Sequence, residues 1–320
     1  MRPYNVIQFG FGSLGVEIFK ILSTMKDLRL VGVVEKDNEK IARNFAPLVG
    51  KNTSIQIVNS ICDIKSRPDV AIHATTSSLH DAYYQIAQIV KNHISVISTC
   101  EELVYPFGSN TKIARKLDGL AKNYHVSVMG VGVNPGFVMD FMVLAFASLC
   151  TTINKIRVER VVDISRRRES LQEKMCVGFS LRQFNRIKKN AGHVGLKESA
   201  MMICDSLNVK ARLSTKVRPI IASKYLKINN KIIKAGHVAG LEHKLVAIRR
   251  KSRFLEMKLI MYAGAEDFDL VEIDGAPPIY VRTSGISGDS ATVALLLNYI
   301  PTLLKAKPGL HTVRNLGLPR

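Results

Sequence analysis

The sequence lacks the features that mark membrane-spanning, disulfide-linked or zinc-binding chains. No apolar run reaches the roughly 18–20 residues that a spanning helix needs. The five cysteines are widely spaced and form no Cys-x-x-Cys pair, which favours free thiols in a reducing cytoplasm over a disulfide framework or a metal site. A strand-like run begins within a few residues of Met1, so we expect no signal peptide. We therefore expect a cytoplasmic protein that binds neither a membrane nor a metal.

Acidic residues are also scarce. Asp and Glu number 26 against 46 Lys and Arg, so the formal net charge is +20. A polyanion such as nucleic acid is one interpretation of this charge. The basic clusters, however, lie beside no aromatic stacking platform and no known nucleic-acid motif. We therefore expect no nucleic-acid partner, and we interpret the charge as a basic surface that attracts anionic cofactors.

The chain does contain an alternation of β-rich and helical segments over its first 135 residues. Six strands are predicted, at Asn5–Phe9, Arg29–Val34, Ser54–Val58, Asp69–Thr75, Ser95–Thr99 and Ser127–Val131. Helical periodicity follows several of them, over Leu14–Met25, Leu79–Lys91 and Thr111–Asn123. Strands that alternate with helices predict a parallel sheet covered on both faces. The fold class is therefore α/β, with a Rossmann-type, doubly wound parallel sheet over residues 1–135.

The pattern changes beyond about residue 150. Longer β-rich runs appear, at Ile153–Asp163, Arg212–Ala222, Ile232–Ile248, Arg253–Ala263 and Asp269–Ile273, with helices at Leu181–Lys189 and Lys197–Leu207. We therefore predict an α+β second domain with a mixed sheet over residues 136–320. It is the expected substrate-binding and dimerisation domain of a homodimer. We expect the helix of about 288–305 to pack back on the first domain.

A glycine-rich turn follows the first predicted strand. It is Gly10-Phe11-Gly12-Ser13-Leu14-Gly15, and a helix follows it. The first glycine permits a tight turn, the second leaves room for a pyrophosphate, and the third lets the helix lie close to the strand. The N-terminus of that helix offers free amides to the phosphates. The strand, turn and helix together predict a dinucleotide-binding site.

An acidic residue, Glu35, ends the second predicted strand, 20 residues after Gly15. A carboxylate there accepts hydrogen bonds from the ribose hydroxyls and repels a 2′-phosphate, which favours NAD. Lys36 and Arg43 stand nearby and keep NADP open as the alternative.

Small residues, most of them polar, end the later strands. Ligands of an open α/β sheet lie beyond the carboxyl ends of its strands. We therefore expect cofactor contacts from Ala74, Thr75, Thr76, Thr99 and Asn134, with Asn134 also a candidate for orienting the substrate.

Two adjacent carboxylates, Glu101 and Glu102, follow the fifth strand, where the nicotinamide is expected. A carboxylate there can exchange a proton while hydride moves, or stabilise a cationic amine or iminium. The position alone does not separate the two residues.

Several longer segments resemble one known family. The segments are "STCEELVYP", "GVGVNPGFVMD", "ERVVDISRRRESLQEKMCVG", "GHVGLKESAMMICDSL" and "AGHVAGLEHKL". They resemble the 2,4-diaminopentanoate dehydrogenases and related native amine dehydrogenases, which share a dihydrodipicolinate-reductase-like N-terminal domain. The resemblance covers essentially the whole chain.

The resemblance implies oxidative deamination of 2,4-diaminopentanoate or a related amine, and the reverse reductive amination of a ketone with ammonia. It assigns amine activation to a glutamate of the pair, and we favour Glu102. For the substrate side we expect contacts from Arg160, His193 and His237.

Two alternatives stay open. One is another two-domain NAD(P)-dependent oxidoreductase, such as a dihydrodipicolinate reductase. The sequence lacks that enzyme's adjacent histidine pair. The other is a non-catalytic dinucleotide-sensing protein, for which the basic surface leaves room.

Overall fold

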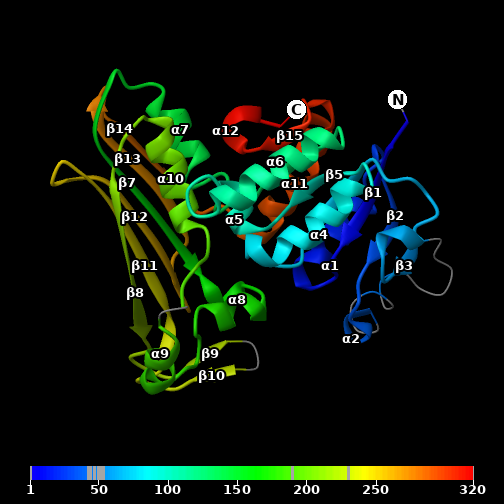
Figure 1. Ribbon diagram of the computed structural model, residues 1–320. Coiled ribbons are helices and arrows are strands. Elements are labelled where there is room, and N and C mark those ends of the chain that lie inside the picture. Colours follow the sequence, from blue (N-terminus) through cyan, green and yellow to red (C-terminus); the bar gives the residue numbers. More distant parts are fainter. Residues whose placement is uncertain are drawn as a thin grey trace. The chain divides into compact units, whose positions relative to one another are not determined.

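The computed structural model describes residues 2–41, 45, 48, 55–188, 191–228 and 231–319 (Figure 1). The chain divides into two compact units. Unit 1 comprises residues 1–136 and 287–320, and unit 2 comprises residues 137–286. The C-terminal 34 residues therefore lie with the first unit, where the sequence analysis had placed only the helix of about 288–305.

Unit 1 is built on a seven-stranded sheet. Its strands are β1 (Tyr4–Phe9), β2 (Leu28–Val34), β3 (Gln56–Val58), β4 (Val70–His73), β5 (Ser95–Ser98), β6 (Ser127–Gly130) and β15 (Gly309–His311). The order across the sheet is β15-β6-β5-β4-β1-β2-β3, and every pair is parallel. The strand order reverses between β1 and β4, which is where such sheets bind their ligands.

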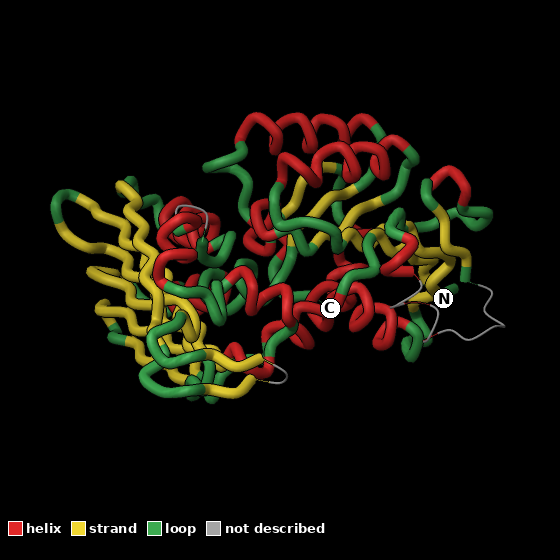
Figure 2. The backbone as a smooth tube through the Cα atoms, turned by 90° about the horizontal axis from the view of Figure 1, so that it is seen from below, coloured by secondary structure: helices red, strands yellow, loops and turns green. Residues whose placement is uncertain are grey.

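Helices cover both faces of this sheet (Figure 2). One layer contains α4 (Leu79–Lys91) and α6 (Thr111–Asn123), and the other contains α1 (Ser13–Leu22) and α11 (Gly288–Lys305). The apolar residues of α4 recur at helical spacing, so one stripe, which includes Leu79, Ala82 and Ile86, is fully buried against the sheet. Among the described residues, unit 1 also contains the short helices α2 (Asn38–Lys40), α5 (Glu101–Val104) and α12 (Val313–Leu316) and the 3-10 helix η2 (Ile61–Asp63).

Unit 2 contains a six-stranded mixed sheet. Its strands are β7 (Thr152–Asp163), β8 (Arg212–Ile221), β11 (Val238–Arg249), β12 (Ser252–Tyr262), β13 (Phe268–Ala276) and β14 (Ile279–Thr283), in the order β14-β13-β7-β12-β11-β8. Only β7 and β12 run parallel to each other. The predicted fold class, a parallel Rossmann-type sheet with a second, mixed-sheet domain, is confirmed.

The described residues of unit 2 also form four α-helices, the 3-10 helix η3 (Ile164–Arg166) and a hairpin. The helices are α7 (Phe141–Ala147), α8 (Glu169–Lys174), α9 (Leu181–Ile187) and α10 (Leu196–Ser206), and α10 packs on β11, β12 and α7. The hairpin pairs β9 (Leu226–Ile228) with β10 (Lys231–Ile233). The sequence predicted one strand over Ile232–Ile248, which is wrong. Gly236 adopts a φ of +81° and turns the chain between β10 and β11.

Across the described part of the chain, no helix combines the length and the apolar character that crossing a membrane requires.

Candidate functional site

The glycine turn lies between β1 and α1, and each of its three glycines has a different environment. Gly10 has a φ of +89°, and a Cβ on it would lie 2.5 Å from the carbonyl oxygen of Ala74. A Cβ on Gly15 would lie 2.5 Å from the carbonyl oxygen of Gly10. A Cβ on Gly12 would meet nothing within 4 Å. Gly10 and Gly15 are therefore required by packing, whereas Gly12 leaves open space at the start of α1.

Gln8 fastens this turn, and the sequence analysis missed it. Its side chain is fully buried, and its Nε2 donates to the carbonyl oxygens of Gly10 at 3.1 Å and Gly15 at 2.8 Å. The signal in the sequence was an amide in the apolar part of the strand, two residues before Gly10.

Phe11 contributes to the site through its backbone only. Its ring is fully buried and packs edge-on against Phe19 and Phe45, with centroids 5.6 and 5.1 Å away. Of the other motif residues, Ser13 is exposed and Leu14 is half-buried.

Glu35 at the end of β2 lies against the glycine turn. Its Oε2 accepts from the N–H of Phe11 at 2.8 Å, and its Oε1 accepts from the N–H groups of Lys36 and Asp37 at 3.0 and 3.1 Å. These bonds fix the carboxylate at the mouth of the turn. Its side chain stays partly exposed, and Lys36 beside it is exposed.

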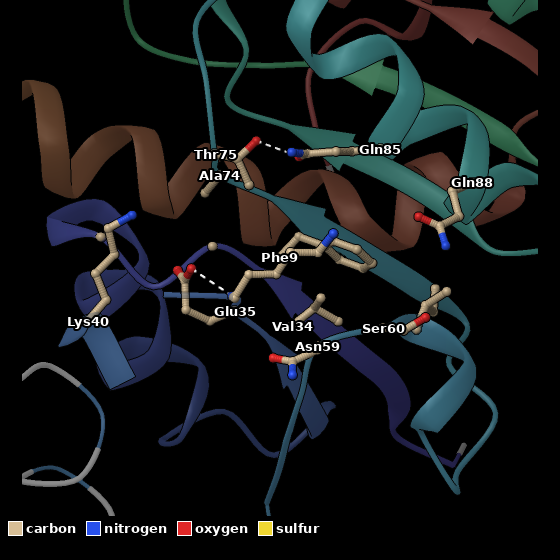
Figure 3. A pocket seen from close by; sticks show the side chains of 14 residues that line it. Phe9, Val34, Glu35, Lys40, Asn59, Ser60, Ala74, Thr75, Gln85 and Gln88 are labelled. Carbon is tan, nitrogen blue, oxygen red and sulfur yellow. Dashed lines mark hydrogen bonds between the residues drawn. The ribbon is translucent and has the colours of Figure 1, made fainter. Parts of the chain in front are cut away.

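A cavity of about 290 Å³ opens next to Glu35 (Figure 3). It lies at the carboxyl ends of β1, β2, β3 and β4, together with one face of α4. From the predicted site it includes Gly10, Gly12, Glu35, Lys36, Ala74 and Thr75. It also includes residues that the sequence analysis did not name, among them Lys40, Asn59, Ser60, Gln85 and Gln88. Gln85 and Gln88 are three residues apart on α4, and this helical spacing was the available signal.

The other predicted strand-end threonines do not line this cavity. Thr76 accepts from the N–H of Ser78 through its hydroxyl, at 3.3 Å. Thr99 donates its N–H to the carbonyl oxygen of His73, at 3.0 Å.

The carboxylate pair begins the short helix α5, and both residues are half-buried. The Oε2 of Glu102 accepts from the backbone N–H of Leu79 at 2.8 Å and from the Nδ2 of Asn110 at 3.2 Å. Leu79 is the first residue of α4, so Glu102 places a negative charge at the N-terminus of that helix. Both bonds are made to Oε2, and they hold the carboxylate in one orientation.

Asn134 follows β6. Its Oδ1 and Nδ2 are both buried, and neither has a hydrogen-bond partner among the described residues. A buried amide without partners is rare in proteins, because each unmade bond costs roughly 1–3 kcal/mol. A ligand group or a water that bonds to Asn134 removes this cost.

The three other predicted substrate residues belong to unit 2. Arg160 on β7 is buried, with Nη1 paired to Oδ1 of Asp269 at 2.5 Å and Nη2 donating to the carbonyl oxygen of Ile286 at 2.6 Å. His193 lies before α10, next to Gly192, where a Cβ would come 3.2 Å from Nδ1 of His243. His237 precedes β11, and its Nδ1 is buried without a described partner.

Within the described part of the chain, no three His, Cys, Asp or Glu side chains gather as metal ligands do.

The fold and the glycine turn define a two-domain dehydrogenase. The chain belongs to the 2,4-diaminopentanoate dehydrogenase family. Residues 137–320 match the model of the 2,4-diaminopentanoate dehydrogenase C-terminal domain. The 2,4-diaminopentanoate dehydrogenase of Acetoanaerobium sticklandii is 31% identical, over 100% of this chain and 95% of that protein. The predicted family is confirmed, and the chain is an oxidoreductase that acts on amines.

Solved structures match the fold over nearly the whole chain. The amine dehydrogenase from Mycobacterium smegmatis has a TM-score of 0.87 at 19% identity, covering 99% of this chain and 96% of that one. The dihydrodipicolinate reductase from Paenisporosarcina sp. TG-14, solved with dipicolinate, has a TM-score of 0.56 at 13% identity, covering 98% and 99%. GenD2 from gentamicin A biosynthesis, solved with NAD, has a TM-score of 0.58 at 13% identity, covering 99% and 90%.

Proposed function

We propose that this chain is a nicotinamide-dinucleotide-dependent amine dehydrogenase that deaminates 2,4-diaminopentanoate or a related amine and catalyses the reverse reductive amination. The observation that carries the proposal is the cavity bounded by the glycine turn and Glu35 at the switch point of a parallel sheet, in a chain of this family.

The residues present fit a dinucleotide. Gly12 leaves open space at the N-terminus of α1, where backbone amides and the helix dipole attract phosphates. Glu35 lies where a ribose hydroxyl donates, and its two oxygens retain acceptor capacity beside their three amide bonds. Asn134 offers a buried donor and a buried acceptor, which suit a carboxamide or a substrate. When bound, the nicotinamide accepts hydride from the amine-bearing carbon and returns it in the reverse direction.

Glu35 supports NAD as the preferred cofactor, because its charge opposes a 2′-phosphate. Lys36 and Lys40 line the same cavity and weaken that preference. Lys40 itself pairs with Asp37, with Nζ 3.4 Å from Oδ2. NADP is therefore the second cofactor in this proposal, and the ratio of kcat/KM for the two cofactors measures the preference.

Glu102 accepts the proton of the substrate amine. Its Oε2 is held by Leu79 and Asn110, so the carboxylate is oriented before substrate arrives. The amine gives a proton to this carboxylate before hydride leaves the neighbouring carbon. Once the carboxyl has passed this proton to water, its restored negative charge stabilises the resulting iminium. Water then adds to the iminium, and ammonia and the ketone are released. Glu101, the adjacent carboxylate, is the alternative residue for this role.

On the substrate side, Asn134, His193 and His237 are the proposed polar contacts. Arg160 also remains in the proposal, but both its Nη atoms already have partners. A substrate carboxylate would have to share this guanidinium with Asp269. We propose that the chain acts in the cytoplasm as a homodimer that associates through unit 2.

The experiment follows the absorbance of the reduced cofactor. Purified protein with NAD or NADP is offered 2,4-diaminopentanoate and a panel of simple amines, and with NADH or NADPH it is offered ketones plus ammonium. Turnover in both directions with at least one amine–ketone pair is expected. Tight binding of NADH without turnover of any amine would overturn the enzymatic role and leave a dinucleotide sensor.

A further inference from the structure

His73 is a buried titratable group that the proposed chemistry does not use. It is the last residue of β4, and it is fully buried. Its Nδ1 lies 2.8 Å from Oγ of Ser98, and its Nε2 lies 2.8 Å from Oε1 of Gln85. The Oγ1 of Thr75 lies 2.9 Å from the same Nε2. Both ring nitrogens therefore have polar partners, and Gln85, a partner of Nε2, lines the cavity.

The neighbouring groups determine which nitrogen carries the proton. Oε1 of Gln85 can only accept, so the hydrogen between it and Nε2 of His73 belongs to the ring. Ser98 Oγ, which accepts from the N–H of Cys100 at 3.1 Å, then donates its own hydrogen to Nδ1 of His73. Burial lowers the pKa of His73 to about 4, so the ring is neutral at neutral pH. A neutral ring that accepts at Nδ1 carries its hydrogen on Nε2. His73 is therefore a donor towards Gln85.

This donor fixes the orientation of the Gln85 carboxamide. Oε1 of Gln85 accepts from Nε2 of His73 and from the hydroxyl of Thr75, at 2.8 Å each. The bond between Thr75 and Gln85 is drawn at the cavity in Figure 3. With the oxygen engaged by two donors, the Nε2 amide of Gln85 is left for the cavity that this residue lines.

We propose that His73 is a positioning residue for the base of the dinucleotide. Through Gln85, it presents an amide donor to an acceptor nitrogen of the purine. The proposal rests on the proposed function, because it requires that the cavity hold the adenosine half of the cofactor. The walls suit a purine, since Phe9, Val34 and Ile61 supply apolar surface and Asn59 and Gln88 add amides for the remaining edges.

The test compares His73→Gln with His73→Leu. The glutamine amide reaches about as far as Nε2 of the histidine and keeps a donor, whereas leucine removes it. Gln85→Leu, on the accessible side of the network, is the second variant and does not disturb the core. Binding is measured by calorimetry with two ligands, ADP-ribose, which contains the base, and reduced nicotinamide mononucleotide, which lacks it.

Leucine at position 73 or 85 is expected to lower the affinity for ADP-ribose about 3–10-fold, the effect of one hydrogen bond. The affinity for the mononucleotide is expected to stay unchanged. His73→Gln is expected to retain most of the affinity. Unchanged ADP-ribose binding in both leucine variants overturns the proposal, and so does an equal loss for the two ligands. Nitrogen-15 spectra of His73 provide an independent check, because a hydrogen on Nδ1 would contradict the assignment.

The binding measurements distinguish a failure of the proposed function from a failure of the role assigned to His73. If the unaltered protein binds neither NADH nor ADP-ribose, the proposed function fails and the inference fails with it. If it binds both and the variants bind equally well, only the role of His73 is wrong.

Discussion

The carboxylate of Glu102 accepts a hydrogen bond of 2.8 Å from the backbone N–H of Leu79, the first residue of α4. The residue proposed to act on the amine therefore also satisfies one of the free amides that every helix leaves at its N-terminus. Asn110 donates to the same oxygen at 3.2 Å. The carboxylate proposed to act in catalysis is thus also part of the local structure of α4.

Replacing Glu102 by Gln is expected to lower kcat by about 10²–10⁴-fold, because the amide cannot take the amine proton. The new side chain keeps an oxygen for Leu79, so α4 and the affinity for NADH are expected to stay intact. Steady-state rates and NADH titration by fluorescence measure the two effects.

Glu101→Gln is the matched control, since it makes the same chemical change one residue earlier. Near-normal turnover in Glu101→Gln supports Glu102. Normal activity in Glu102→Gln with loss in Glu101→Gln would transfer the role to Glu101.

Asn110→Ala is expected to reduce kcat with little change in the affinity for NADH. The variant removes one bond to the charged Glu102, worth about 1.5–3 kcal/mol, and leaves the bond from Leu79 in place. Asn110 also precedes α6, so thermal unfolding is followed in parallel. An unchanged kcat would mean that Leu79 alone suffices to orient the carboxylate.

Gly12 and Gly10 of the turn are expected to respond differently to replacement by alanine. Gly12→Ala should fold normally, because its Cβ meets nothing within 4 Å. It should lower the affinity for NADH about tenfold, or roughly 1.4 kcal/mol, because the methyl group obstructs the phosphates. Gly10→Ala should cost about 1–3 kcal/mol of stability for its φ of +89° alone, before the clash with Ala74. Denaturant unfolding and NADH titration separate the two effects. Normal NADH affinity in a folded Gly12→Ala protein would place the phosphates elsewhere.

Arg160 and Asp269 are 3% and 1% exposed and form a buried ion pair across β7 and β13. Arg160→Met is expected to destabilise the protein by about 3–5 kcal/mol, because it leaves the Asp269 carboxylate buried and unpaired. Adding Asp269→Leu should restore much of that loss. Urea unfolding measures both variants. If KM for the amine rises in Arg160→Met while stability is unchanged, Arg160 binds substrate instead.

His73 predicts how stability changes with pH. Its pKa is about 4 in the folded protein, because burial disfavours the charged ring, against an ordinary 6.5. The unfolded chain therefore binds the proton more readily, and stability is lost as pH falls from about 6.5 towards 4. The full effect is roughly 3 kcal/mol.

Burial also lowers the pKa of His243, which acts in the same direction. The contribution of His73 is therefore measured as the difference between the unaltered protein and His73→Gln in urea unfolding across this pH range. Parallel stability curves for the two proteins would contradict the assignment.

Much of unit 1 was predictable, because its strands are short, apolar and separated by periodic helices. All six strands predicted there occur, with ends shifted by up to two residues. The predicted start of the third, Ser54, lies outside the described residues. β15 was missed because its three residues, Gly309–His311, carry no alternation and become a strand only by pairing with β6. β14 in unit 2 was missed for a different reason. Pro277 and Pro278 come directly before it, and prolines count against a strand in a sequence-based prediction.

The part of the site where a sequence motif fixes the backbone could be predicted. The part that depends on hydrogen bonds between side chains was harder to predict. The glycine turn and Glu35 follow from spacing. The roles of Gln8, Gln85 and His73 depend on hydrogen bonds between residues far apart in sequence, such as His73 to Ser98. Arg43, proposed from the sequence as a neighbour of Glu35, lies outside the described residues.

The pairing of β15 with β6 has a consequence for synthesis on the ribosome. Residues 137–286 form a complete compact unit that lies between the two parts of unit 1 in the sequence. Unit 2 can therefore fold while the chain is still being made. Unit 1 cannot complete its sheet until residues 309–311 emerge. Until then, β6 is an edge strand whose backbone groups on one side have no partner strand. Translation order thus leaves the cofactor-binding unit the last to close, and a ribosome stalled after residue 286 would hold a finished unit 2 beside an unfinished parallel sheet.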